Sequence, residues 1–167
     1  MKNLLRTCLL TLVVASTPFL SQAQKRQHAI HVDIGTLVLM SNATLNYETQ
    51  VAQFLDGAVQ FNVRTGVGWA VAWESRYVGP ILTGVFLTGV GSHHFEVNLG
   101  VSPAYDYESA RINRSNDPGT FDFMDHVDWL PIGDVGYRYQ KPEGGFIFRA
   151  KGGTTGVGVG IGWAFEG

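Results

Sequence analysis

Hydrophobic and polar residues alternate with a period of two in three segments of this chain. The segments run from Val59 to Val71, from His94 to Ser102 and from Val157 to Phe165. In each, aliphatic and aromatic residues fill most of one set of alternate positions, while glycine, alanine and polar residues fill the other. A period of two is typical of a β-strand with one apolar face. We therefore predict a strand in each segment.

Five weaker segments of the same kind bring the predicted number of strands to eight. They are Ala29–Met40, Thr44–Gln50, Pro80–Val90, Asp128–Gln140 and Gly145–Lys151. The spacing of a buried amphipathic helix is absent from the sequence after residue 23. The pattern therefore indicates an all-β domain.

The connections between the predicted strands differ in length. Short turn-forming sequences follow the second, fourth and sixth strands, at residues 55–57, 91–93 and 141–144. Another connection is predicted at 73–79, and a single long loop at Asp106–Val127. An even strand number, with short turns at one end and longer loops at the other, is the pattern of a bacterial outer-membrane barrel. We predict a closed antiparallel eight-stranded up-and-down transmembrane β-barrel.

Alternation alone also fits a soluble barrel that encloses a ligand, so the size of the polar-face residues matters. Glycine dominates that face, at Gly35, Gly66, Gly68, Gly100, Gly136, Gly158, Gly160 and Gly162. Small residues suit the interior of an eight-stranded barrel, which has barely room for its own side chains. On a wet outer surface glycine would only weaken the strands. We therefore expect the apolar face to point outward, toward lipid.

Aromatic residues of the apolar face lie near both ends of the predicted strands. They are Phe61, Phe95, Tyr139, Phe146 and Phe165 toward the short turns, and Trp69, Tyr105 and Trp129 toward the longer loops. Two such groups resemble the aromatic girdles at the two interfaces of a membrane barrel.

Seven charged residues fall on the face that this assignment turns inward. They are Asp33, Glu48, Arg64, Glu96, Asp134, Arg138 and Arg149. Isolated charges would be costly there, but guanidinium groups can fork onto carboxylates. We interpret the set as a structural interior charge network rather than as a gate or ion path.

The first 23 residues have the layout of a secretory signal peptide. Lys2 and Arg6 precede an apolar run from Leu9 to Leu20, which is followed by Ser21-Gln22-Ala23. The run is too short for a membrane-spanning helix, which needs about 20 apolar residues. We expect cleavage after Ala23, which leaves residues 24–167 as one outer-membrane β-barrel domain.

Removing the signal changes both charge and thiol content. It takes away two of the 12 basic residues and none of the 14 acidic ones, so the net charge becomes −4. A nucleic-acid partner is therefore not expected. The single cysteine, Cys8, lies within the signal, so we expect no disulfide in the mature chain.

A longer motif carries a resemblance to known proteins. Gly136-Tyr137-Arg138-Tyr139-Gln140, with Pro142 and then Gly144-Gly145-Phe146-Ile147-Phe148-Arg149, resembles the last strands of small, mostly uncharacterised outer-membrane β-barrel proteins. The resemblance implies the fold, a place in the outer membrane of a Gram-negative bacterium, and assembly by the barrel assembly machinery. It implies no activity.

We find no catalytic constellation in the sequence. Ser92-His93-His94 is the obvious nucleophile candidate, but it falls at a short turn with no acid assigned to it. The acidic run Asp122–Asp128 could supply oxygen ligands to a cation, but it lacks a fixed metal-site spacing. His31 and Asp33 share a face and could share a metal or a proton; we assign them to the interior instead.

The sequence therefore favours a non-enzymatic outer-membrane barrel with a structural or surface-interaction role. We expect no cofactor and no metal site. Outer-membrane lipid is the expected partner, and lipopolysaccharide is a candidate through Arg76, Arg111 and Arg114 on the outer loops. Two alternatives stay open: a lipid-modifying enzyme of the outer membrane, and a soluble secreted barrel that binds a small apolar ligand.

Overall fold

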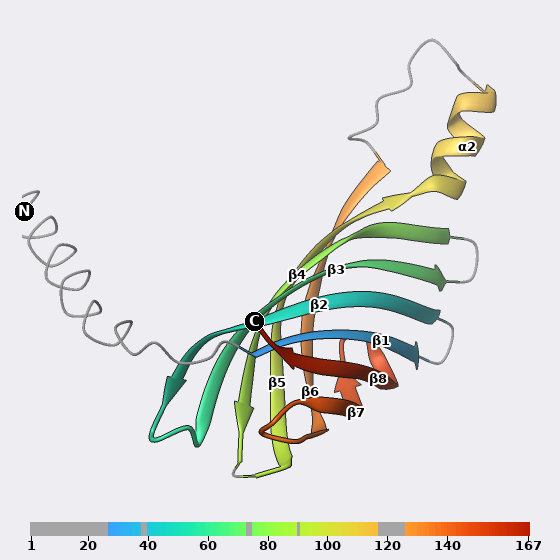
Figure 1. Ribbon diagram of the computed structural model, residues 1–167. Helices are drawn as coiled ribbons and strands as arrows, with labels where there is room; N and C mark the ends of the chain where they lie inside the picture. The colour runs from blue at the N-terminus through green and yellow to red at the C-terminus, as the bar shows by residue number, and fades with distance from the viewer. Residues whose placement is uncertain (1–26, 38–39, 73–74, 90, 117–125) are drawn as a thin grey trace, which may run out of the picture.

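The computed structural model describes residues 27–37, 40–72, 75–89, 91–116 and 126–167. Eight antiparallel strands follow one another around a closed barrel, and β8 pairs with β1 (Figure 1). The elements are β1 (Gln27–Leu37), β2 (Met40–Phe54), β3 (Val59–Ala72), β4 (Ser75–Thr88), β5 (His93–Asp106), α2 (Tyr107–Asn116), β6 (Val127–Gln140), β7 (Gly145–Gly153) and β8 (Gly156–Glu166). No helix in these ranges is long and apolar enough to cross a bilayer.

The prediction of a closed antiparallel eight-stranded barrel is confirmed. Several strands are longer than predicted: β2 continues to Phe54, past a bulge between Gln50 and Ala52. β4 already begins at Ser75, so the connection predicted at residues 73–79 is much shorter. The predicted signal peptide, residues 1–23, lies outside the described residues.

The prediction of a loop at Asp106–Val127 is wrong in its first part. Residues 107–116 form α2, which was not predicted because its sequence is polar and shows no apolar stripe. Asp106 caps it: its carboxylate accepts hydrogen bonds from the backbone N–H groups of Glu108 and Ser109, at 3.1 and 3.3 Å. Residues 117–125 lie outside the described part of the chain.

The two ends of the barrel differ. We call the end where β2 connects to β3, β4 to β5 and β6 to β7 the turn end, and the end that carries α2 the helix end. At the helix end the wall is uneven, because β5 and β6 reach beyond the ends of β7 and β8 (Figure 1). β6 pairs with β5 from Val127 to Tyr139, but with β7 only from Asp134 to Gln140.

The half of β6 that extends beyond β7 is therefore a strand edge, and two features limit further pairing there. Pro131 has no N–H to offer to another strand. Thr154 covers the adjoining positions: its N–H donates to Gly133 O at 3.0 Å, and its hydroxyl accepts from Gly133 N at 2.8 Å and donates to Pro131 O at 3.2 Å.

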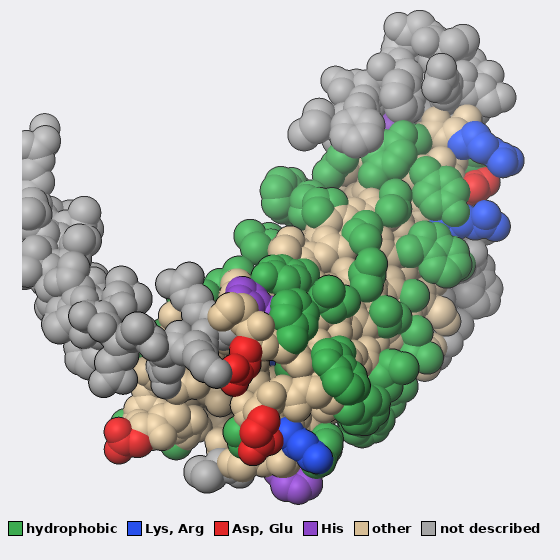
Figure 2. All heavy atoms as spheres, viewed as in Figure 1, with side chains coloured by type: hydrophobic (Ala, Val, Ile, Leu, Met, Phe, Trp, Pro, Cys, Tyr) green, Lys and Arg blue, Asp and Glu red, His purple; other side chains and the backbone are tan. Residues whose placement is uncertain are grey.

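The two faces of the wall separate as the alternation predicts. Large apolar side chains such as Val67, Leu99, Trp129 and Ile161 are exposed on the outside. The buried charged side chains, by contrast, lie inside the barrel. Figure 2 shows hydrophobic side chains spread over the middle of the wall, with acidic and basic side chains gathered toward the two ends.

Candidate functional site

The most polar part of the described barrel is a charge network inside the lumen. Six of the seven charged residues singled out by the sequence meet there, namely Asp33, Glu48, Arg64, Glu96, Arg138 and Arg149. They come from six strands, β1, β2, β3, β5, β6 and β7, because each occupies an inward position of its strand. Three carboxylates and three guanidinium groups make the network neutral as a whole.

Arg149 joins opposite parts of the network. Its Nη1 atom donates to both carboxylate oxygens of Asp33, at 2.8 and 2.6 Å. Its Nε atom donates to Glu96 Oε2 at 3.0 Å, and its Nη2 atom donates to Glu96 Oε1. The side chain is 1% exposed, so these bonds replace the water that the guanidinium loses on burial.

Gly160 makes the contact between Arg149 and Asp33 possible. Gly160 on β8 is the register partner of Arg149 on one side and of Asp33 on the other. A Cβ atom at this position would overlap the Asp33 carboxylate. The absence of a side chain on β8 therefore lets the ion pair pass across the inner surface of that strand.

Glu48 is the second centre of the network. Its Oε2 atom accepts hydrogen bonds from Nε and Nη2 of Arg64, at 2.9 and 2.7 Å. Its Oε1 atom accepts from Arg138 Nη1 and from Asn62 Nδ2, each at 2.6 Å. Arg64 also reaches Glu96 Oε1 at 3.0 Å, so the two glutamates share a cation.

His31 lies in the same layer and is 1% exposed. Its Nδ1 atom is 3.1 Å from Arg149 Nη1 and 3.4 Å from Asp33 Oδ2, while its Nε2 atom is 3.6 Å from Glu48 Oε2. The His31 and Asp33 pair singled out by the sequence is thus part of the network. Within the described residues, no group of three or more His, Cys, Asp or Glu side chains has the geometry to hold a metal ion.

Asp134, the seventh predicted residue, lies apart from these six. Its carboxylate accepts hydrogen bonds from the Thr155 hydroxyl at 2.8 and 2.9 Å and from Thr155 N at 3.2 Å, and Lys151 Nζ is 3.5 Å away. Lys151 was not among the charged residues predicted to face inward. Alternation from Arg149 would have placed it inside, since the two are separated by one residue.

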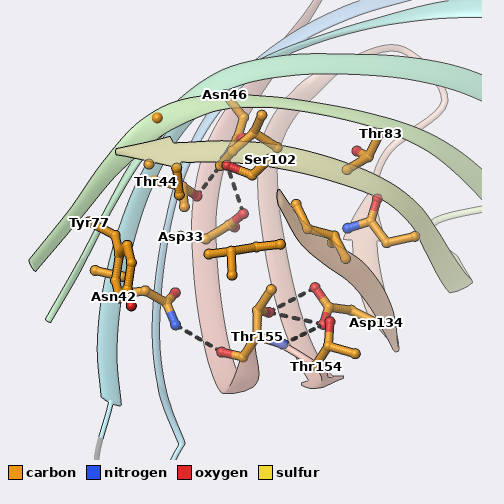
Figure 3. A pocket seen from close by; sticks show the side chains of 18 of the residues that line it. Asp33, Asn42, Thr44, Asn46, Tyr77, Thr83, Ser102, Asp134, Thr154 and Thr155 are labelled. Carbon is orange, nitrogen blue, oxygen red and sulfur yellow. Dashed lines mark hydrogen bonds between the residues drawn. The ribbon is translucent and has the colours of Figure 1, made fainter. Parts of the chain in front are cut away.

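A cavity of about 460 Å³ lies between the charge network and the helix end. Asp33 and Arg64 border it on the network side, and Figure 3 shows Asn42, Thr44, Thr83 and Ser102 among the side chains around it. It exists because many inward positions on this half are small, including Gly68, Ala70, Gly79, Ser102 and Ala104. The expectation that side chains leave almost no room in the lumen is therefore wrong for the helix-end half.

A second, smaller cavity of about 200 Å³ lies at the turn end, beside Gln60, His94 and Gln140. The two cavities share no lining residue in the described structure. Between them lie the charge network and buried apolar side chains, Val85, Leu87 and Ile147. The lumen is therefore occluded at mid-height.

The other sequence candidates do not join this site. His93 turns outward, with its Nδ1 atom 2.6 Å from the Tyr137 hydroxyl, while His94 is buried inside. Arg76 and Arg111 are exposed at the helix end, and Arg111 lies 3.7 Å from Glu108 on the same helix. Most of the acidic run Asp122–Asp128 lies outside the described residues.

Comparison with known proteins adds no assignment. No protein-family model matches the chain, and no curated protein sequence matches it.

Proposed function

We propose that this protein is a non-enzymatic outer-membrane barrel of a Gram-negative bacterium, with an occluded lumen and a structural or surface-interaction role. One observation carries the proposal. The apolar surface of the barrel encircles all eight described strands, while six buried charges are gathered at its centre. A bilayer is the environment that covers such a surface on every side.

The distribution of charge on the outer face supports a lipid environment. By alternation, the outward positions of the described strands carry one charged side chain, Arg76, which lies at the helix end of β4. Charged side chains facing lipid destabilise a barrel most at the bilayer midplane and little near the interfaces. A soluble protein has no such reason to keep charge off the middle of its surface.

Strand length and aromatic positions agree with this environment. A strand that crosses a bilayer needs about 9–11 residues, and the described strands have 9 to 15. Trp69 and Trp129 are exposed toward the helix end, whereas Phe95 and Phe165 are exposed toward the turn end. Aromatic residues at two levels are typical of the two membrane interfaces.

The soluble alternative requires the Phe61, Val63 and Trp69 face to line an internal cavity. These residues occupy outward positions of β3, and Trp69 is 49% exposed. This orientation favours the membrane barrel over the soluble one. The enzyme alternative requires a nucleophile, a histidine and an acid that converge at the helix end.

The surface role is assigned to the helix end. Most connections there are short, and α2 with the segment after it is the longest. Periplasmic turns of bacterial barrels are short and the longer loops are extracellular, so the turn end faces the periplasm in this proposal. Arg76 and Arg111 would then lie on the extracellular side of the membrane, where guanidinium groups can contact lipopolysaccharide phosphates.

Fractionation of cells that express the full precursor tests the proposal. The expected result is a band in the outer-membrane fraction that migrates differently on a detergent gel before and after boiling, because a closed barrel resists unfolding by detergent. A Gly160→Asp variant serves as the unfolded control, because its new side chain would overlap the Asp33 carboxylate and prevent the charge network from forming. A soluble periplasmic or secreted product would refute the membrane assignment.

A further inference from the structure

The cavity at the helix end contains polar atoms that have nothing to bond to. Thr83 and Asn98 are each 3% exposed and both line the cavity. The Thr83 hydroxyl oxygen and Asn98 Oδ1 have no hydrogen-bond partner in the described structure. Asn42 Oδ1, also in the lining, has none among the described residues either.

Two of these residues, Thr83 and Asn98, lie on the neighbouring strands β4 and β5. Thr83 is the register partner of Arg64, so it sits at the level of the charge network. Asn98 is two residues from Gly100, the register partner of Thr83, so the two side chains are diagonal neighbours on the inner face. Buried acceptors without a donor are costly, so the closed end of the cavity is suited to a group that donates hydrogen bonds.

The wall nearer the helix end is different in character. Ile81, Leu130 and Ile132 line it with Tyr77 and the alanines Ala70 and Ala104. These side chains are apolar although they stand at inward positions, where the network half of the lumen carries charged and amide groups. The cavity thus has a polar closed end and, on the side of β4 to β6, an apolar wall that extends toward the mouth, whereas Asn42, Thr154 and Thr155 line the other side.

The size of the cavity sets the size of the ligand. Small-molecule sites are typically about 300–1,000 Å³, mostly apolar, with a few polar groups that fix orientation. The cavity here has about 460 Å³. An apolar cavity of about 150 Å³ already holds one benzene ring, so this space admits a two-ring or short-chain compound.

We propose that the lumen of this barrel binds a small amphipathic molecule, with a hydroxyl or amide donor at Thr83 and Asn98 and its apolar body against Ile81, Leu130 and Ile132. The site goes beyond the structural role proposed above, and it does not depend on that role. It lies inside the barrel, so its binding can be measured wherever the protein resides in the cell.

Equilibrium dialysis of the folded barrel, held in an amphipathic polymer, tests the site with 2-naphthol and with naphthalene, which lacks the donor. We expect saturable binding of 2-naphthol with one site per chain, and about tenfold weaker binding of naphthalene, because it leaves the oxygen atoms unpaired. Binding that rises linearly with either probe, as partition into the polymer would, overturns the proposal.

One matched pair of variants and a third, single variant locate the binding. Ile81→Trp fills the cavity and should reduce 2-naphthol affinity at least tenfold, whereas Leu82→Trp, on the outer face of the same strand, should not change it. Thr83→Val keeps the shape of the side chain and removes the hydroxyl; it should weaken 2-naphthol severalfold and leave naphthalene unaffected. Heat-dependent gel migration confirms that each variant is folded. Equal 2-naphthol affinity of Ile81→Trp and Leu82→Trp would place the binding outside the lumen.

Discussion

Arg149 on β7 and Asp33 on β1 are joined by two hydrogen bonds, of 2.8 and 2.6 Å, although β8 lies between their strands. The bond passes over Gly160, the register partner of both residues. The charge network therefore depends on a missing side chain as much as on the charged groups themselves.

We expect Gly160→Ala to destabilise the barrel by about 1–3 kcal/mol, because the new methyl group would displace the Asp33 carboxylate from Arg149. Gly152→Ala is the matched control: a Cβ at Gly152 meets no atom within 4 Å, so that variant should unfold like the wild type or slightly later. Urea unfolding in lipid vesicles measures both. Equal stability of the two variants would show that the approach across Gly160 is not needed.

The occluded lumen makes a prediction about conductance. Arg138 is fully buried and donates to Glu48, so Arg138→Ser removes a large side chain from the layer between the two cavities. We expect the wild type to give little steady current in a planar bilayer and the variant to give a severalfold larger one. Val135→Ala, an outward truncation on the same strand, should behave as the wild type. A wild type that already conducts as well as Arg138→Ser would contradict the occlusion.

A charge on the outer face distinguishes lipid from water around the barrel. Leu99 is exposed near the middle of β5, so Leu99→Arg should destabilise the protein in a bilayer by about 2–4 kcal/mol. Val78→Arg, near the helix end, should cost at most about 1 kcal/mol. Unfolding in lipid vesicles gives both values. If the outer face is normally in water, both variants should change stability by less than about 0.5 kcal/mol.

Asp106 should control the stability of α2. Replacing a helix-capping Asp by Ala typically lowers helix stability by about 1 kcal/mol. The fraction of molecules in which the helix is unfolded should then be roughly fivefold larger. Trypsin should therefore cleave Asp106→Ala at the exposed Arg111 about fivefold faster than the wild type. Asp128→Ala, which removes an exposed acid at the same end, is the control. Identical cleavage rates for Asp106→Ala and the wild type would mean that the cap does not hold the helix.

Some features of the fold could be predicted because they depend on neighbours in the sequence. The alternation from Val59 to Val71 assigns each residue to a face, because successive side chains of a strand point to opposite sides of the sheet. In a barrel made of a single sheet, these two sides are the lumen and the outer surface. α2 could not be recognised in the same way, because its polar sequence carries no apolar stripe. The role of Thr154 at the edge of β6 depends on β7 ending at Gly153, which no local pattern indicates.

Local patterns in the sequence were enough to predict the number of strands, their alternating direction and seven of the charged residues that face inward. These follow from local periodicity and turn chemistry. Which inward charges meet depends on the folded barrel: Arg149 bonds to Asp33, 116 positions away in the chain, while Asp134 bonds to Thr155 instead of joining the six. The reason is that strand register and barrel closure, which are long-range properties, set the level at which each inward side chain lies.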